Sequence, residues 1–207
     1  MSRTVLVTLV GAAALVGLAV FGTLAFTGGD PDSSTMTMPD GSTMPMSEMP
    51  PATSFDRAFI DAMVPHHEAA IAMAREAKQA GLSEPELVEI ADAILTTQQS
   101  EIDRMKQWRQ EWFGSSEIDP KGADELGMSM EGMGMSGEPG MLAEAEDVDG
   151  AFASAMIAHH EGAVAMARMA LSRSDRPEIR ELAQAIVDTQ TDEIERLRPS
   201  ATDGDGS

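Results

Sequence analysis

Residues Phe55–Ala77, FDRAFIDAMVPHHEAAIAMAREA, recur as residues Val148–Ala170, VDGAFASAMIAHHEGAVAMARMA, at a constant offset of 93. Each copy is followed by a second related stretch, EIADAILTTQQSEIDRM and then ELAQAIVDTQTDEIERL, at an offset of 92. Both stretches of each copy carry apolar residues at helical spacing, which predicts two helices per copy. The chain therefore contains an internal duplication of one helical hairpin.

Turn residues indicate where the helices begin and end. Ser83-Glu-Pro-Glu86 and Asp175-Arg-Pro-Glu178 are typical of capping boxes with proline in the first turn, and Gly81 stands where a helix commonly ends. The predicted helices span 54–80, 84–113, 148–172 and 176–198. One hairpin alone buries too little apolar surface, so we expect an all-α antiparallel four-helix bundle built from hairpin repeats 54–113 and 148–198.

Two segments lack this periodicity. Residues 28–53 and 114–147 are rich in Gly, Pro, Ser and Thr, and each holds five of the 17 methionines. This composition predicts a disordered, Met- and Pro-rich tether over 28–53 and a Met- and Gly-rich linker of the same kind over 114–147. Residues 199–207 are expected to form a disordered tail.

The N-terminal segment, residues 1–27, is strongly apolar. Arg3 precedes 23 uncharged residues, Thr4–Phe26. A secretory signal core usually has about 7–15 apolar residues, whereas a membrane-spanning helix needs about 20. Length favours an N-terminal hydrophobic helix that anchors the chain in the cell membrane, with a cleaved signal as the alternative. Both interpretations place the remainder outside the cytoplasm, either membrane-anchored and facing outside or secreted or periplasmic.

Composition excludes several classes of function. The net charge of −21, from 14 basic and 35 acidic side chains, argues against a nucleic-acid partner, because a phosphate backbone requires a basic face. The absence of Cys excludes disulfides, thiolate zinc sites, iron–sulfur clusters and cysteine nucleophiles. No Ser or Thr lies in a nucleophile-elbow motif, and we assign no enzymatic activity.

All four histidines occur as adjacent pairs, one pair in each copy. On the helical pattern, each pair and a methionine one turn earlier lie along the apolar stripe of the first helix, and one glutamate lies mid-stripe on the second. The candidate metal ligands are His66, His67, Met63 and Glu101 in the first copy, and His159, His160, Met156 and Glu193 in the second. We expect each hairpin to turn its histidines toward its own core, with its glutamate reaching and orienting one of them.

The types of candidate ligand limit which metals the site could bind. Imidazole and thioether groups suit copper, and thioether favours Cu(I). Imidazole with an inward carboxylate would also suit iron, manganese or zinc in a bundle core. The metal-free alternative is a structural hydrogen bond between a buried histidine and a glutamate. Repetition of the histidine pair beside a methionine favours a metal site.

The sequences FIDAMVPHHEAAIAMA and FASAMIAHHEGAVAMA, each followed by a TQxxEI helix, resemble the bacterial exported family called domain of unknown function 305. The resemblance covers about 55–113 and 148–198. It implies a ferritin-like four-helix bundle in two tandem copies, with the paired histidines as the family hallmark. Some members are implicated in copper or silver binding and tolerance.

Three functions follow from these features. The first is an exported, membrane-tethered copper-binding protein that acts as a buffer or carrier in homeostasis or tolerance, its Met-rich tethers passing Cu(I) to the His/Met sites. The second is a ferritin-like iron or manganese oxidoreductase, which is weakened by having one inward glutamate per hairpin. The third is a metal-free structural or interaction module whose polar core fixes the helix register.

Overall fold

The computed structural model describes residues 35–37, 43–45, 52–135 and 140–201. The predicted N-terminal anchor or signal, residues 1–27, lies outside this part of the chain. Among the described residues, none of the helices combines the length and apolar character needed to cross a membrane.

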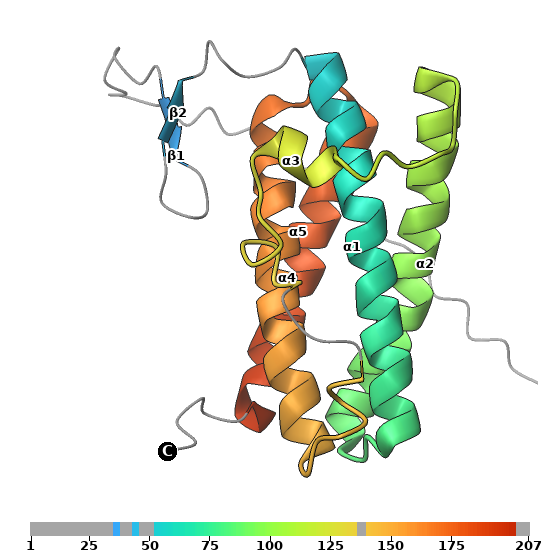
Figure 1. Cartoon of the computed structure of the whole chain (residues 1–207), viewed down its shortest axis with the longest axis vertical. Helices are drawn as coiled ribbons and strands as arrows, with labels where there is room; N and C mark the ends of the chain where they lie inside the picture. The colour runs from blue at the N-terminus through green and yellow to red at the C-terminus, as the bar shows by residue number, and fades with distance from the viewer. Residues whose placement is uncertain (1–34, 38–42, 46–51, 136–139, 202–207) are drawn as a thin grey trace, which may run out of the picture. The chain divides into compact units, whose positions relative to one another are not determined.

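Four long helices form the fold, and the predicted all-α four-helix bundle is confirmed (Figure 1). They are α1 Ala52–Ala80, α2 Pro85–Phe113, α4 Val148–Arg173 and α5 Pro177–Leu197. Each begins and ends within two residues of its predicted bounds. Helix α1 packs against α2 and α4 against α5, as two hairpins, and the hairpins join mainly through α1 and α4. Helices α2 and α5 make far less contact with each other.

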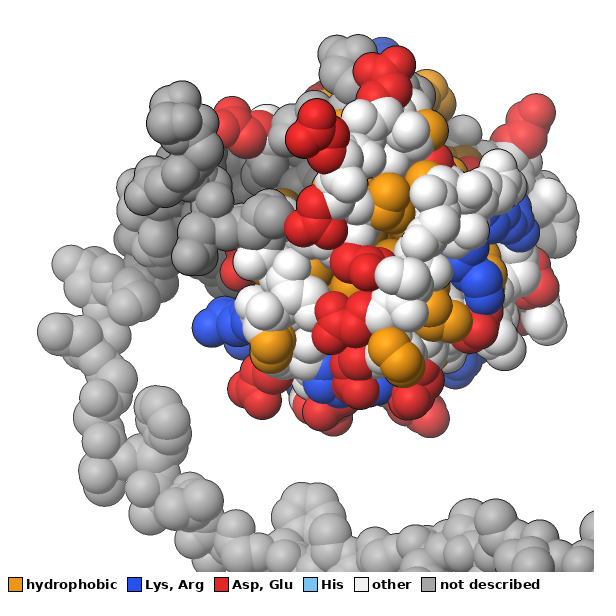
Figure 2. All heavy atoms as spheres, turned by 90° about the horizontal axis from the view of Figure 1, so that it is seen from below, with side chains coloured by type: hydrophobic (Ala, Val, Ile, Leu, Met, Phe, Trp, Pro, Cys, Tyr) orange, Lys and Arg blue, Asp and Glu red, His pale blue; other side chains and the backbone are white. Residues whose placement is uncertain are grey.

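The core lies between these helices and is built from the apolar stripes of both repeats. Its largest fully buried side chains include Phe55, Phe59, Phe152, Leu87, Ile90 and Met105. Seen from the lower end of the bundle, Asp and Glu side chains cover much of the surface and Lys and Arg are fewer (Figure 2). An apolar interior under an acidic surface agrees with the net charge of −21.

The helix ends confirm one turn signal and correct another. Gly81 adopts a left-handed backbone conformation, with φ of 108°, as expected for a residue that ends a helix. Helices α2 and α5 do begin with proline, but their N-cap residues are Glu84 and Arg176, and neither side chain makes a capping hydrogen bond. The predicted capping boxes were therefore wrong, because the partner at the start of α2 comes from the other repeat.

That partner is Asp149, near the start of α4. Its carboxylate accepts hydrogen bonds from the Ser83 backbone N–H and the Ser83 hydroxyl, both at 2.8 Å, and from the Glu84 backbone N–H at 3.4 Å. The equivalent residue of the first repeat is Asp56, whose Oδ2 lies 3.3 Å from Nε of Arg176 at the other hairpin turn. Asp56 and Asp149 are equivalent in the two repeats, and each connects its own hairpin to the turn of the other hairpin.

Shorter elements lie outside the bundle helices. Strands β1, Thr35–Thr37, and β2, Thr43–Pro45, pair antiparallel with Met36 opposite Met44, inside the predicted tether. Helix α3 spans Gly122–Leu126, and a 3-10 turn, η2, spans Arg198–Ser200.

The segment between the hairpins is packed against the bundle. Leu126, Met128, Met133 and Leu142 are buried in the common core. A Cβ atom at Gly122 would lie 2.5 Å from the Asp61 carbonyl carbon, so only glycine lets α3 approach α1 this closely. For the described part of 114–147, the expectation of a disordered linker was wrong, because glycines permit close backbone packing and methionines fill the gaps.

Candidate metal centre

The two inner imidazoles, His66 on α1 and His159 on α4, meet at the junction of the hairpins. Their ring centroids are 3.8 Å apart with an interplanar angle of 40°, and their residues are 0% and 1% exposed. The helical pattern predicted two separate sets of imidazoles, each in its own hairpin. The structure joins the two sets into one cluster, because α1 and α4 are the helices through which the hairpins pack.

The two outer imidazoles contact the buried glutamates. His67 Nε2 lies 2.8 Å from Glu101 Oε2 and donates a hydrogen bond to it. His160 Nε2 lies 2.8 Å from Glu193 Oε2 in the equivalent contact of the second hairpin. The prediction that each glutamate reaches a histidine of its own hairpin is confirmed. In the first hairpin the carboxylate can only accept, so the proton of a neutral His67 sits on Nε2 and Nδ1 holds the lone pair.

A backbone carbonyl fixes the proton of His66 in the same way. His66 Nε2 lies 2.8 Å from the Met133 carbonyl oxygen, which can only accept, so Nε2 donates. Met133 belongs to residues 128–135, which we call the Met strap. A Cβ atom at Gly162 of α4 would lie 2.2 Å from that same carbonyl oxygen, so glycine at 162 lets the strap lie directly against α4.

Several ring nitrogens of the cluster have no hydrogen-bond partner. They comprise Nδ1 of all four histidines and Nε2 of His159. Buried polar atoms are nearly always paired in folded proteins, and each unpaired one needs an explanation. A bound cation explains unpaired nitrogens, because the lone pair of a neutral imidazole is a metal ligand.

Burial keeps the inner rings neutral. Burial, with a further contribution from neighbouring His67, lowers the pKa of His66 to about 3. Burial, followed by the proximity of His66, also lowers the pKa of His159 well below its ordinary value. Both inner rings are therefore uncharged near neutral pH, which is the form that binds metals.

The chain matches the family described as "Domain of unknown function (DUF305)" over residues 24–108 and 81–200. It belongs to the DUF305 family. No curated protein sequence matches it. Among solved structures, the Cu(I)-bound form of CopM is 33% identical with a TM-score of 0.59, covering 70% of this chain and 93% of that one. The Cu(II)-bound form of CopM is 35% identical with a TM-score of 0.60 and the same coverage. The structure named "putative secreted protein DUF305 from Streptomyces coelicolor" is 25% identical with a TM-score of 0.65, covering 74% of this chain and 98% of that one.

The methionine candidates of this DUF305 chain lie in the core. Met63 and Met156 are fully buried, and each precedes its histidine pair by three and four residues, so the side chains share one side of the helix. Within the described ranges, no three His, Asp or Glu side chains are grouped so as to hold a metal ion.

No sequence pattern indicated the Met strap as part of this site. The strap contacts His66 through a backbone carbonyl, and such a contact cannot be predicted from the type of side chain. The indication present in the sequence was the glycine at position 134. The structure explains it, because Gly134 has a φ of 66° and a Cβ atom there would lie 2.1 Å from the Ala158 carbonyl oxygen. Glycine beside methionine in a linker can thus indicate close packing.

Proposed function

We propose that this DUF305 chain is an exported copper-binding protein with one centre shared by its two hairpins. The observation that supports it most is the contact between His66 and His159, two buried neutral imidazoles with unpaired nitrogens. Without a metal, an uncharged histidine cluster in an apolar core contributes little to stability, because its buried polar atoms lack hydrogen-bond partners.

Within this proposal, the inner imidazoles are the principal ligands, and Met63 and Met156 supply thioethers. His67 and His160 complete the cluster, oriented by Glu101 and Glu193. Neutral imidazole and thioether are soft enough to prefer Cu(I) over harder ions. Solved forms of CopM with Cu(I), Cu(II) and silver support copper, and silver as a second cation.

The same considerations disfavour iron, manganese and zinc. Di-iron and di-manganese bundles use several carboxylates, whereas the two buried glutamates here already contact His67 and His160. A metal-free structural module would leave both ring nitrogens of His159 buried and unpaired. The metal titration below separates the zinc and metal-free alternatives from copper binding.

Export and delivery complete the proposal. The apolar stretch Thr4–Phe26 supports export, as an anchor or as a signal. The name of the related Streptomyces coelicolor structure, "putative secreted protein DUF305", agrees with export. The Met-rich segment 28–53 would capture Cu(I) loosely and pass it to the core. The net charge of −21 raises the local cation concentration without selecting the metal. A buffer or carrier in copper homeostasis or tolerance fits these features.

The test is a metal titration of the full chain purified without a chelating tag. Cu(I) is titrated anaerobically against a chromophoric competitor, with Cu(II) and Zn(II) in parallel. We expect Cu(I) to bind more tightly than Zn(II), and its affinity to fall in the variant His66→Ala, His67→Ala, His159→Ala, His160→Ala. Circular dichroism verifies that the helices persist. Unchanged Cu(I) affinity in that variant would show that Cu(I) binds to the Met-rich segments, and it would contradict a centre in the core.

A further inference from the structure

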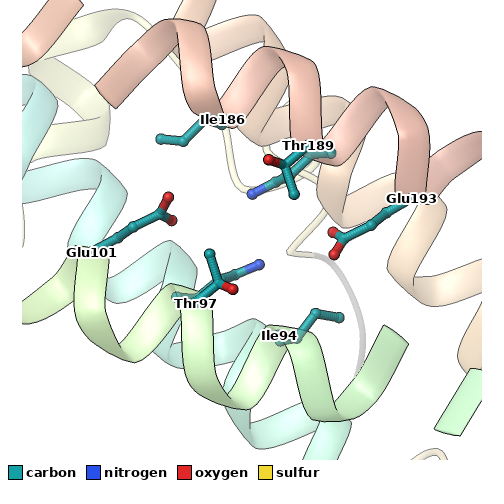
Figure 3. Close-up of a pocket in the computed structure, with 8 residues that line it drawn as sticks. Ile94, Thr97, Glu101, Ile186, Thr189 and Glu193 are labelled. Atoms are coloured by element: carbon teal, nitrogen blue, oxygen red, sulfur yellow. The ribbon is translucent and has the colours of Figure 1, made fainter. Parts of the chain in front are cut away.

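A polar pocket opens between α2 and α5, which make far less contact with each other than α1 and α4 do. It is lined symmetrically by one set of residues from each repeat (Figure 3). The set is Ile94, Thr97, Gln98 and Glu101, with Ile186, Thr189, Gln190 and Glu193. Thr97 and Thr189 face each other across the middle, and the two glutamates lie at opposite ends. The enclosed volume of ≈ 10 Å³ is about the room that one water molecule needs.

The side chains that line the pocket lie between solvent and the two outer histidines. Thr97 and Thr189 are exposed, whereas Gln98 and Gln190 are only 3% exposed. Glu101 lines the pocket and also contacts His67, and Glu193 does the same with His160. A continuous series of polar side chains therefore connects the surface to the imidazoles.

Two buried amide oxygens in this series lack hydrogen-bond partners. The Oε1 atoms of Gln98 and Gln190 make no hydrogen bond, although each residue is almost fully buried. Leaving a buried acceptor unpaired costs about 1–3 kcal/mol. A passing cation or its hydration water would satisfy both oxygens, which gives these glutamines a role that the bundle alone does not require.

The other sides of the cluster are covered. Helix α1 packs closely on α2, and α4 on α5, while the Met strap lies over the α1/α4 side through the Met133 carbonyl and Gly162. Among the described residues, the α2/α5 face is thus the polar side from which a cation can approach.

We propose that this pocket is the route by which copper enters and leaves the core. The inference rests on the proposed copper-binding function and adds the path. Glu101 and Glu193 attract the cation and replace its water, and the amides of Gln98 and Gln190 form the gate between the exposed threonines and the carboxylates. A route affects the rates of loading and release together and leaves the equilibrium affinity unchanged.

The experiment measures the rate of Cu(I) transfer from a chromophoric donor complex to the full chain by stopped flow, and the rate of release to a stronger chelator. The test variant is Thr97→Arg with Thr189→Arg, which places two positive charges at the exposed mouth. The matched control is Gln99→Arg with Thr191→Arg, equivalent exposed positions that do not line the pocket. A second variant, Gln98→Leu with Gln190→Leu, closes the gate with apolar side chains of similar size.

We expect loading and release to slow by at least about tenfold in both pocket variants, with equilibrium affinity and stoichiometry equal to those of the control. Wild-type rates in folded pocket variants would overturn the route and leave copper binding standing. Loss of equilibrium Cu(I) binding in the Gln98→Leu, Gln190→Leu variant would also overturn the route, because it would show that the glutamines are ligands. A wild-type chain that takes up no Cu(I) overturns the proposed function and the route with it.

Discussion

His66 and His159 occupy equivalent positions in the two repeats, and their imidazoles contact each other in the core with centroids 3.8 Å apart. Because the two residues come from different hairpins, the cluster exists only when the hairpins are packed together. Metal binding at this position should therefore stabilise the bundle as a whole rather than one hairpin.

Acid should destabilise the metal-free protein through the inner histidines. The pKa of His66 is about 3 in the fold, against about 6.5 in the unfolded chain, and that of His159 is lowered in the same direction. The unfolded state binds these protons first, so the stabilisation is complete above about pH 6.5 and is lost as the pH falls toward 3. Two such groups contribute a slope of up to about 2.7 kcal/mol per pH unit.

Urea denaturation of the metal-free chain between about pH 7.5 and 4.5 measures this slope. The variant His66→Leu with His159→Leu should show a shallower dependence, because its inner positions no longer titrate. Equal slopes for the wild type and the variant would contradict the assignment of neutral inner rings.

Loss of the buried carboxylates should weaken metal binding without unfolding the bundle. The variant Glu101→Gln with Glu193→Gln keeps the shape of each side chain but no longer holds the outer imidazole as a carboxylate does. We expect Cu(I) affinity to fall by about 10–100-fold. The control is Glu68→Gln with Glu161→Gln, which are repeat-equivalent and exposed. An affinity equal to that of the control would show that the carboxylates do not support the metal.

Alanine at position 162 should destabilise the protein although it improves helix propensity. The added Cβ atom would lie 2.2 Å from the Met133 carbonyl oxygen, so the Met strap must shift and its bond to His66 must weaken. We expect a loss of about 1–3 kcal/mol in the free energy of unfolding, against a propensity gain of about 1 kcal/mol. Glu161→Ala, in the same turn but exposed, is the control. A more stable Gly162→Ala protein would mean that the strap does not lie against α4.

Asp149→Ala should loosen the connection between the hairpins. The substitution removes the acceptor of three hydrogen bonds from Ser83 and Glu84 at the start of α2. Loss of a helix cap of this kind costs about 0.5–2 kcal/mol. The control Asp188→Ala lies at an exposed position of α5, and chemical denaturation compares the two. Equal stabilities would show that the contact contributes nothing.

The repeat made much of this structure predictable. The periodicity of each copy determines the buried face of every long helix, and the mid-stripe positions of Glu101 and Glu193 correctly indicated their histidine contacts. These features depend on spacing within one hairpin, which sequence records directly.

Contacts between hairpins were not predictable in the same way. A helical pattern shows which side of α1 is apolar but not which helix covers it, so the meeting of His66 with His159 was missed. The Asp149 contact was likewise hidden, because Ser83 next to a proline matches a local capping pattern and its partner lies 66 residues away. The Met strap lacks periodicity and packs through backbone atoms at glycines.

The most direct test of a shared centre is the number of tightly bound Cu(I) ions in single-histidine variants. Anaerobic titration against a strong chromophoric competitor gives this number for the wild type, His66→Asn and His159→Asn. A centre built from both repeats predicts one tight equivalent in the wild type and its loss in either single variant. Two equivalents in the wild type, with one retained in each variant, would mean that the hairpins bind copper independently and would contradict the shared centre.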